Sequence, residues 1–202
     1  LRVFFNKEDK KRYKEKLFPS CFNPARNFKR KLIWIHAASI GELKSIIPII
    51  KNLNTQNKYE FLITSVTLSS SKLILSELKN EQNIIHRFFP IDTLNLVEKF
   101  LDIWMPDSII FIDSEIWPNF IFEIKKRKIP SAIVNGRITK KTFNRWMLVP
   151  NFAREIFNTF DLCLASSNQS KEYLKLLNVK NSIFIGNLKF AAEINADDIK
   201  DN

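Results

Sequence analysis

The feature that most constrains the fold is a repeated alternation of short apolar runs with amphipathic stretches, which begins near residue 32. Short apolar runs separated by segments of helical periodicity indicate repeated strand and helix units around a parallel sheet. We expect strands at 32–37, 59–65, 84–89, 108–112, 131–135, 161–165 and 182–185. We expect helices near 41–55, 69–80, 93–104, 118–128, 140–159 and 168–177. The predicted fold class is therefore α/β, with helices flanking a parallel sheet.

Charge and composition divide the chain into three parts. Residues 1–31 contain eleven Lys or Arg against three Asp or Glu, which gives +8 of the total net charge of +11. This basic arm suits an anionic membrane surface or nucleic acid, but it also fits a solvated charged helix. Residues 32–192 form the predicted folded domain, and the polar, acidic end at 193–202 indicates a domain boundary.

Overall composition excludes several classes of protein. With 45% hydrophobic and 26% charged residues, the chain is typical of a globular domain rather than a disordered segment. Cys21 and Cys163 have no zinc-binding spacing with either histidine, which predicts a reducing compartment and no structural metal. No apolar run reaches the roughly 18 residues of a membrane-spanning helix. The chain begins at Leu1 without a methionine, so we expect a fragment whose upstream segment is missing.

Small and polar residues gather where the predicted strands end. They form the segments 36–39 (HAAS), 64–71 (TSVTLSSS), 113–119 (DSEIWPN), 135–137 (NGR) and 186–189 (GNLK). The carboxyl ends of parallel strands meet at one edge of a sheet, and ligands of open α/β sheets bind there. We therefore expect one crevice to collect all five segments.

The segment from Ser39 to Glu42 fits two interpretations. In a capping box, Ser39 accepts a hydrogen bond from the backbone N–H of Glu42, whose side chain reaches back to the Ser39 N–H. Alternatively, Glu42 points into the crevice and takes a proton from a sugar hydroxyl. Gly41 lies in the first helical turn, where Ala is favoured by roughly 1 kcal/mol, and close approach of a ligand would explain its missing side chain. Because a helix N-terminus favours a charged carboxylate, any rise in the pKa of Glu42 requires burial.

A second pair of candidates follows the apolar run at 108–112. Asp113 and Glu115 are two residues apart, so on an extended segment both side chains face the same side. Paired carboxylates there could bind hydroxyls or stabilise a developing cation. Pro118 suits the first turn of a helix. The alternative is a strand-to-helix turn with an acidic cap and no further role.

Two further motifs place a cation beside a turn. Asn135 and Arg137 flank a glycine and could form merely a turn, or Arg137 could pair with a carboxylate or a phosphate. Gly186 and Asn187 shortly precede Lys189, which could neutralise a phosphate or a sugar acid. Each of these motifs is weak when taken alone.

The remaining polar and aromatic residues have structural interpretations. The hydroxyl-rich segment 64–71 is expected to cap the second helix. His36 and His86 are expected to be strand-end histidines with hydrogen-bond partners rather than catalysts. The tryptophans other than Trp117 are expected in the core or facing a membrane.

Taken together and in order, these motifs resemble a known family. The motifs are HAASIGE at 36–42, TSVT at 64–67, FPID at 89–92, SEIWPN at 114–119, IP at 129–130, NGRIT at 135–139 and GNLKF at 186–190. Over about residues 8–191 the chain resembles the N-terminal domain of the Kdo (3-deoxy-D-manno-octulosonic acid) transferases of lipopolysaccharide assembly. The resemblance implies a Rossmann-like parallel sheet, the N-terminal half of a GT-B glycosyltransferase, with 32–192 as the acceptor-binding domain. It also implies that 193–202 begin a linker to a missing C-terminal donor domain.

The resemblance implies roles for individual residues. Glu42 matches the family's general base. Asp113 and Lys189 occupy the places of the two residues thought to stabilise the transition state. The substrate-binding residues that we expect are Ser39, Gly41, Glu115, Asn135, Arg137, Gly186 and Asn187.

Three departures from the family pattern indicate a diverged member with altered acceptor contacts. Asp113 stands where the family has a glutamate, and its carboxylate reaches about 1 Å less far, a misplacement that can cost about a hundredfold in rate. Ser70 or Ser71 stands where glycine is usual. Ala191 stands where an aspartate commonly follows LKF.

The implied reaction is transfer of Kdo from CMP-Kdo to a lipid A precursor with inversion. CMP-Kdo is a cosubstrate, and we expect no cofactor and no metal. The expected partners are the lipid A precursor, CMP-Kdo held by the missing domain, and the anionic inner membrane, which the basic arm would contact at its cytoplasmic face. Nucleic acid is not expected, and the isolated fragment is expected to be inactive.

Two alternatives remain open at this point. The first is a different lipid- or envelope-directed glycosyltransferase that uses another nucleotide sugar. The second is a non-catalytic basic binding domain, in which Glu42 only caps a helix.

Overall fold

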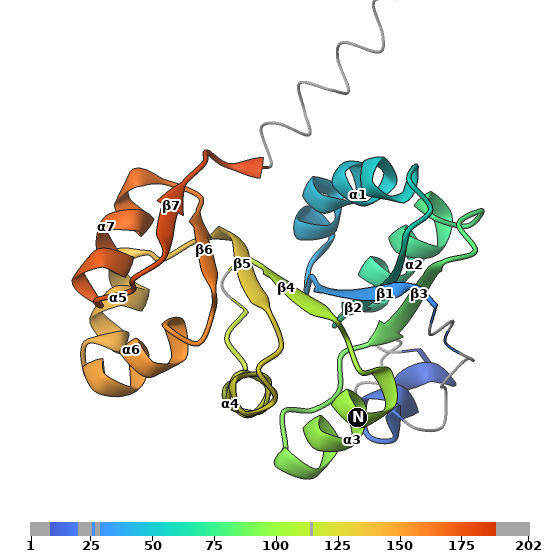
Figure 1. The fold of residues 1–202 in the computed structure, drawn as a ribbon, viewed down its shortest axis with the longest axis horizontal. Coiled ribbons are helices and arrows are strands. Elements are labelled where there is room, and N and C mark those ends of the chain that lie inside the picture. The colour runs from blue at the N-terminus through green and yellow to red at the C-terminus, as the bar shows by residue number, and fades with distance from the viewer. Residues whose placement is uncertain (1–8, 20–25, 27–28, 114, 189–202) are drawn as a thin grey trace, which may run out of the picture.

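The computed structural model describes residues 9–19, 26, 29–113 and 115–188 (Figure 1). These residues form one seven-stranded sheet in the order β3-β2-β1-β4-β5-β6-β7, in which every pair of neighbours is parallel. The strands are β1 (Lys31–His36), β2 (Tyr59–Ser65), β3 (Ile84–Phe88), β4 (Ser108–Ile112), β5 (Ser131–Gly136), β6 (Leu162–Ala165) and β7 (Ser182–Phe184). The helices are η1 (Arg12–Lys16, a 3₁₀ helix), α1 (Ile40–Asn54), α2 (Leu68–Glu77), α3 (Leu94–Trp104), α4 (Pro118–Arg127), α5 (Lys140–Trp146), α6 (Pro150–Phe157) and α7 (Asn168–Leu176). The predicted α/β class with a parallel sheet is confirmed.

The order of the strands reverses direction between β1 and β4. The chain runs outward from β1 through β2 to β3, and then returns to place β4 on the other side of β1. His36, at the end of β1, is in register with Thr64 of β2 and Phe111 of β4. Such a reversal places the loops after β1 and β4 next to each other at the carboxyl edge of the sheet, where open α/β sheets bind ligands.

Helices cover both faces of the sheet (Figure 1). α1 and α2 pack on one face, where Ile35 and Ile63 belong to one buried cluster. α3, α4, α6 and α7 pack on the other face, around Trp34. Trp34 is fully buried, and its ring centroid lies 4.9 Å from that of Phe100 and 5.2 Å from that of Phe120. Burial of both faces explains why the central strands appear in the sequence mainly as apolar runs.

One predicted helix is wrong. The expected helix at 140–159 is two helices, α5 and α6, joined by a turn at 147–149. Pro150 occupies the first position of α6 and could not extend α5, because proline has no backbone N–H. Val149, with φ −137° and ψ 60°, lies outside the helical region, as a residue before proline often does.

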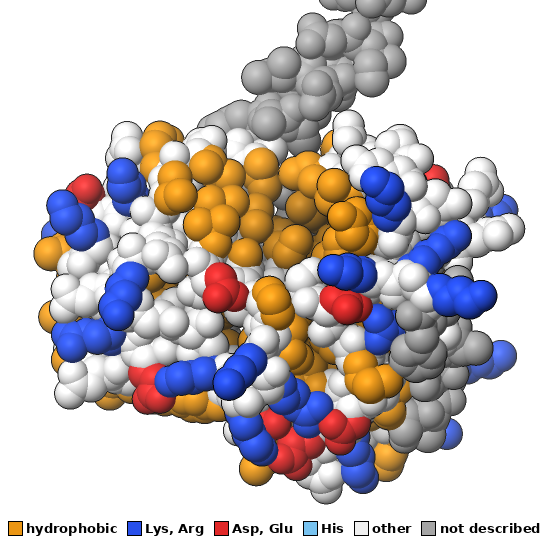
Figure 2. Space-filling model, viewed as in Figure 1, with side chains coloured by type: hydrophobic (Ala, Val, Ile, Leu, Met, Phe, Trp, Pro, Cys, Tyr) orange, Lys and Arg blue, Asp and Glu red, His pale blue; other side chains and the backbone are white. Residues whose placement is uncertain are grey.

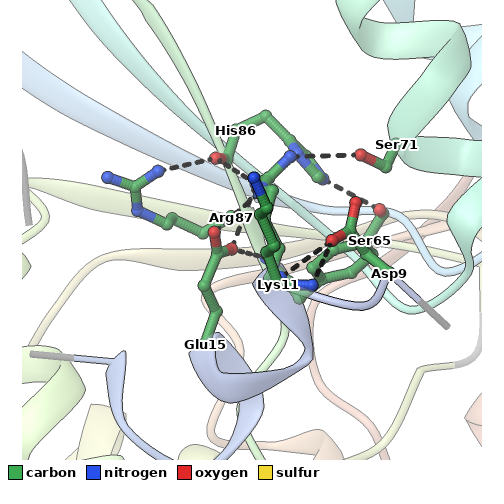
Figure 3. A network of polar contacts seen from close by, with 9 residues as sticks. Asp9, Lys11, Glu15, Ser65, Ser71, His86 and Arg87 are labelled. Atoms are coloured by element: carbon green, nitrogen blue, oxygen red, sulfur yellow. Dashed lines mark hydrogen bonds and ion pairs between the residues drawn. The ribbon is translucent and has the colours of Figure 1, made fainter. Parts of the chain in front are cut away.

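The described part of the basic arm packs against the edge strand β3 (Figure 3). Glu15 is 1% exposed, and its carboxylate accepts hydrogen bonds from Arg12 Nε at 2.7 Å and from the backbone N–H of Phe88 at 2.8 Å. The alternative of a solvated charged helix therefore does not fit residues 12–16, where Glu15 is buried. η1 pairs a backbone donor on the outer edge of the sheet, which protects that edge from pairing with another chain.

His86 lies at the centre of the same contacts (Figure 3). Its Nδ1 lies 3.0 Å from Arg12 Nη2, and its Nε2 lies 3.0 Å from Ser65 Oγ. Burial, together with the positive charges of Arg12 and Arg87, lowers the pKa of His86 to about 3. A neutral imidazole accepts from Arg12 and donates to Ser65, so the expectation of a histidine with hydrogen-bond partners is confirmed.

Candidate active site

Three acidic side chains lie together at the carboxyl ends of β1 and β4. Glu42 is in the first turn of α1, directly after β1, while Asp113 and Glu115 follow β4. The negative charges of Glu115 and Asp113 both act on the carboxyl group of Glu42. The expectation that the segments after these two strands meet is therefore confirmed.

Ser39 is the N-cap of α1, as the capping box predicts, but Glu42 reaches a different backbone group. Ser39 Oγ accepts from the backbone N–H of Glu42 at 3.3 Å, and it donates to Glu42 Oε1 at 2.6 Å. Glu42 Oε2 accepts from the backbone N–H of Ala38 at 2.8 Å, one residue before the predicted donor. The two donors belong to the same short loop, so they fix the orientation of a carboxyl group that is only 7% exposed.

The pKa of Glu42 is raised above its ordinary value. Burial is the largest cause, and the charges of Glu115 and Asp113 add to it, while the hydrogen bonds from Ser39 and Ala38 act in the opposite direction. The sequence predicted that burial would be needed for such a rise. A carboxylate with a raised pKa holds a proton more firmly, which suits a general base.

Glu115 is held by two ring systems. Trp117 Nε1 donates to Glu115 Oε2 at 3.0 Å, and His36 Nε2 lies 3.6 Å from the same oxygen, close enough for attraction but too far for a hydrogen bond. Burial acts to raise the pKa of Glu115, but His36 and Trp117 outweigh burial and lower the pKa. Glu115 therefore keeps its negative charge under conditions in which Glu42 is more easily protonated.

His36, in the segment 36–39 that was expected at this edge of the sheet, faces the candidate site. His36 is fully buried, and its Nδ1 lies 2.9 Å from Thr64 Oγ1, which accepts a hydrogen bond from Trp34 Nε1 at 2.8 Å. The Thr64 hydroxyl can then donate its own proton to Nδ1, which places an N–H on Nε2, facing Glu115. The expectation of a hydrogen-bonded histidine is confirmed at Nδ1, whereas Nε2 has no hydrogen-bond partner within the described residues.

Asp113 does not lie on an extended segment, contrary to the expectation. Its φ is +63°, in the left-handed region, and its backbone N–H donates to Val134 O of β5 at 2.9 Å. The left-handed region costs most side chains roughly 1–2 kcal/mol, and aspartate is among the residues that tolerate it. The chain therefore turns immediately after β4, and this turn leads to Glu115.

The end of β5 and the segment after β7 also meet. Asn135 is 2% exposed with φ +61°, and its side-chain Oδ1 accepts from the backbone N–H of Leu188 at 3.2 Å. Gly186 has φ +90°, a conformation that glycine adopts without strain. The expected meeting of these segments is confirmed as far as Leu188. Lys189 lies outside the described residues.

Sequence reasoning missed Asp92, which joins two of the motifs. Its carboxylate accepts from the backbone N–H groups of Asn119 at 3.2 Å and Phe120 at 3.0 Å, and Asn119 Nδ2 donates to Asp92 O at 2.7 Å. The start of α4, where Pro118 stands at the first position as predicted, is therefore capped by a distant loop. No local pattern reveals a cap that lies 27 residues away. The only hint in the sequence was that the family resemblance includes both FPID at 89–92 and SEIWPN at 114–119.

The hydroxyl-rich segment caps α2, as predicted. Thr67 is the N-cap, and its side chain accepts from the backbone N–H of Ser70 at 3.1 Å. Ser70 Oγ also donates to Ala38 O at 3.2 Å. Ser70 thus ties the start of α2 to the loop that holds Glu42, a contact that a glycine could not make.

The remaining expected substrate-binding residues are less enclosed. Gly41 and Arg137 are exposed, and Asn187 is half-buried. Among the residues that the structure describes, no group of three His, Cys, Asp or Glu is arranged to hold a metal ion.

A profile of the family described as 3-deoxy-D-manno-octulosonic-acid transferase (Kdo transferase) matches residues 10–192. The chain belongs to this family. Kdo transferases of Rickettsia felis and Rickettsia bellii are 36% identical over 168 residues and 34% identical over 194 residues, covering 83% and 96% of this chain. A probable mitochondrial Kdo transferase of Arabidopsis thaliana is 35% identical over 129 residues, or 63% of this chain. These matches cover 36%, 45% and 28% of the relatives' own lengths, so this Kdo transferase family member spans less than half of each.

Solved structures show the same fold at low sequence identity. The UDP-GlcNAc 2-epimerase of Neisseria meningitidis, bound to UDP-GlcNAc, matches with a TM-score of 0.59 and 14% identity, covering 85% of this chain and 51% of its own. The UDP-N-acetylglucosamine 2-epimerase of Rickettsia bellii matches with a TM-score of 0.57 and 15% identity, covering 86% of this chain and 49% of its own. The Rossmann-like, GT-B-type architecture implied by the sequence is therefore confirmed. In the described part of this Kdo transferase family member, no helix has the length and apolar character needed to cross a membrane.

Proposed function

We propose that this chain is the acceptor-side domain of an enzyme that transfers Kdo from CMP-Kdo to a lipid A precursor with inversion of configuration. The observation that carries this proposal is the pair Glu42 and Glu115, two neighbouring carboxyl groups whose pKa values are shifted in opposite directions. Opposite shifts in neighbouring acids are typical of sites in which one group exchanges a proton and the other stays charged. Family membership over residues 10–192 supports the same class of reaction.

Glu42 acts as the general base. The acceptor hydroxyl gives its proton to the Glu42 carboxylate as its oxygen bonds to the anomeric carbon of Kdo. The bond from that carbon to the phosphate oxygen breaks, and CMP leaves with the bonding electrons. Attack from the face opposite CMP inverts the configuration. Ser39 Oγ and the Ala38 N–H hold the base in place, which reduces the cost of reaching the reactive geometry.

The charges that develop during transfer suit the other residues of the site. The sugar ring becomes positive, and the carboxylates of Asp113 and Glu115 would stabilise it. The phosphate of CMP becomes more negative, and Lys189 is proposed to stabilise that charge. Asn135, Arg137, Gly186 and Asn187 are proposed to bind substrate. CMP-Kdo is a cosubstrate, and the scheme uses neither a metal nor a further cofactor.

An apolar surface beside the site supports a lipid acceptor. Figure 2 shows hydrophobic side chains gathered between α1 and β7. In these two elements, Ile40 is 38% exposed and Ile183 is 51% exposed, and Ile40 is two residues before Glu42. Acyl chains would lie on apolar surface while a sugar hydroxyl reaches the base. The enzyme is accordingly proposed to work at the cytoplasmic face of the bacterial inner membrane.

The test joins this chain to the second half of the Rickettsia bellii relative, with which it shares 34% identity over 194 residues. The chimera is incubated with CMP-Kdo and a lipid A precursor in detergent, and the product is identified by its mass. Glu42→Gln should lower the rate by about 10²- to 10⁴-fold, the usual effect of losing a general base. Glu60→Gln is the matched control, because Glu60 is also 7% exposed but lies near the amino end of β2. Transfer of a different sugar, or transfer that Glu42→Gln leaves unchanged, contradicts the proposal.

A further inference from the structure

The turn between α5 and α6 exposes three apolar side chains in succession. Leu148 is 81% exposed, the largest fraction among the large hydrophobic residues that the structure describes. Met147 and Val149 beside it are 45% and 49% exposed, and Phe152 in the first turn of α6 is 39% exposed. Several large apolar side chains exposed within one short segment mark an interaction surface rather than ordinary scatter.

The backbone of this turn is already paired within the protein. The N–H groups of residues 147, 148 and 149 donate to carbonyl groups three or four residues earlier, at 2.9, 3.1 and 3.0 Å. The next residue, Pro150, has no N–H group. An unpaired polar backbone group is costly in an apolar medium, so a turn with its donors bonded internally can enter such a medium at low cost.

Aromatic residues attach the turn to the core. The ring of Trp146 lies 6.4 Å from that of Phe152 and 5.5 Å from that of Phe157, which is 3% exposed. The Phe152 ring also lies 6.0 Å from that of Phe122 in α4. The exposed side chains therefore project from well-packed helices, so binding requires little further ordering of the turn.

Exposed basic residues flank the apolar turn in the sequence. From Lys140 to Arg154 the sequence contains four basic residues and no acidic one, and Lys140, Lys141, Arg145 and Arg154 are all exposed. The nearest acid in sequence, Glu155, is paired with a lysine of α4 at 3.1 Å. An apolar turn flanked by exposed basic residues is complementary to a bilayer with anionic lipid headgroups above hydrocarbon.

We propose that the turn at 147–149 inserts into the headgroup region of an anionic bilayer, where Lys140, Lys141 and Arg145 bind lipid phosphates. The contact does not depend on which sugar the enzyme transfers. It differs from the membrane contact expected of the basic arm because it uses a different segment of the chain, and in the described part of that arm Arg12 is bonded to Glu15.

The experiment measures sedimentation of the chain with vesicles of phosphatidylcholine, with and without phosphatidylglycerol. The wild type should bind the anionic vesicles, and salt should weaken this binding. Leu148→Glu should weaken it by about tenfold or more, because a buried leucine is lost. Leu75→Glu is the matched control, since Leu75 is a 55% exposed leucine on α2, and it should bind like the wild type.

A second measurement reports the depth of insertion. Lipids with brominated acyl chains quench nearby tryptophans, and Trp34 and Trp104 are fully buried. Trp117 is half-buried beside Glu115, far along the sequence from the turn. The proposal predicts quenching of Trp146 that is lost in Trp146→Phe, whereas quenching that persists in this variant comes from Trp117 and contradicts insertion of the turn. Thermal unfolding checks that each variant is folded.

Three further results overturn the proposal. The first is an absence of binding to anionic vesicles. The second is equal binding by Leu148→Glu and Leu75→Glu. The third is a lipid-free dimer of the wild type that Leu148→Glu makes monomeric while vesicle binding is unchanged, because the turn would then bind a second copy of the chain.

Discussion

Ser39 and Glu42 are joined by two hydrogen bonds, one from the Glu42 backbone N–H to Ser39 Oγ and one from the Ser39 hydroxyl to Glu42 Oε1. The contacts that begin α1 therefore also orient the proposed base. The two interpretations of this segment, a capping box and a catalytic carboxylate, are compatible because each uses different atoms of the same side chains. Glu42 Oε2, bonded to the Ala38 N–H, completes the arrangement.

Ser39→Ala removes both of these hydrogen bonds. The free energy of unfolding should fall by about 1 kcal/mol, the usual cost of losing an N-cap. The pKa of Glu42 should rise further, because the Ser39 hydroxyl lowers it in the wild type. Urea unfolding measures the first effect, and an NMR titration of the glutamate carboxyl carbons measures the second. Ser39→Thr keeps the hydroxyl and should change both little, whereas a fall in the Glu42 pKa in Ser39→Ala contradicts this account.

The raised pKa of Glu42 predicts a pH dependence of stability. Above the ordinary value of 4.5 and up to the higher pKa of the folded state, the native protein binds more protons than the unfolded chain. The free energy of unfolding should therefore fall as pH rises through this interval. Glu42→Gln removes the effect, so its stability relative to the wild type should increase with pH in urea unfolding. A difference that stays constant with pH is the contrary result.

The lowered pKa of His86 predicts a pH dependence of stability in the opposite direction. Its pKa is about 3 in the folded protein against an ordinary value of 6.5, so between these values the unfolded chain binds more protons. Stability should fall as pH drops through this interval, by up to about 1.4 kcal/mol per pH unit. His86→Gln should flatten this part of the stability profile. Urea unfolding across the interval checks the prediction, and an unchanged slope in the variant speaks against it.

Asn135 should be sensitive to substitution for two reasons. Asn135→Ala loses the hydrogen bond to the Leu188 N–H and places a less tolerant residue at φ +61°. We expect it to lower the free energy of unfolding by about 2 kcal/mol. Asn135→Gly loses the same hydrogen bond but relieves the strain, so it should be the milder change. If the two variants are equally stable in urea unfolding, the strain makes no contribution.

Much of the fold follows from local sequence patterns. Strands β1, β2 and β4 are largely apolar because both faces of the sheet are covered there. The turns between elements contain several Pro, Asn and Gly residues. The helix expected at 140–159 did not account for Pro150, which begins a new helix. The docking of η1 on β3 was not predictable, because it depends on Glu15 reaching Phe88, 73 residues away.

The candidate site shows the same division. The order of the motifs brought Glu42, Asp113 and Glu115 into one prediction. The sequence could not show that Asp113 is left-handed, nor that Thr64 directs His36 toward Glu115, because both depend on contacts between separate strands. Local patterns therefore identified which residues meet, and long-range contacts decide how they are oriented.

The most direct test of the role of Glu42 is the pH dependence of Kdo transfer by the chimera in single-turnover experiments. The account predicts a rate that falls at acid pH with an apparent pKa above 4.5, as the base becomes protonated. It also predicts that Glu42→Gln loses about 10²- to 10⁴-fold in rate together with this acid limb, while Glu60→Gln keeps both. A Glu42→Gln variant that transfers Kdo at the wild-type rate with the same pH profile would contradict the account.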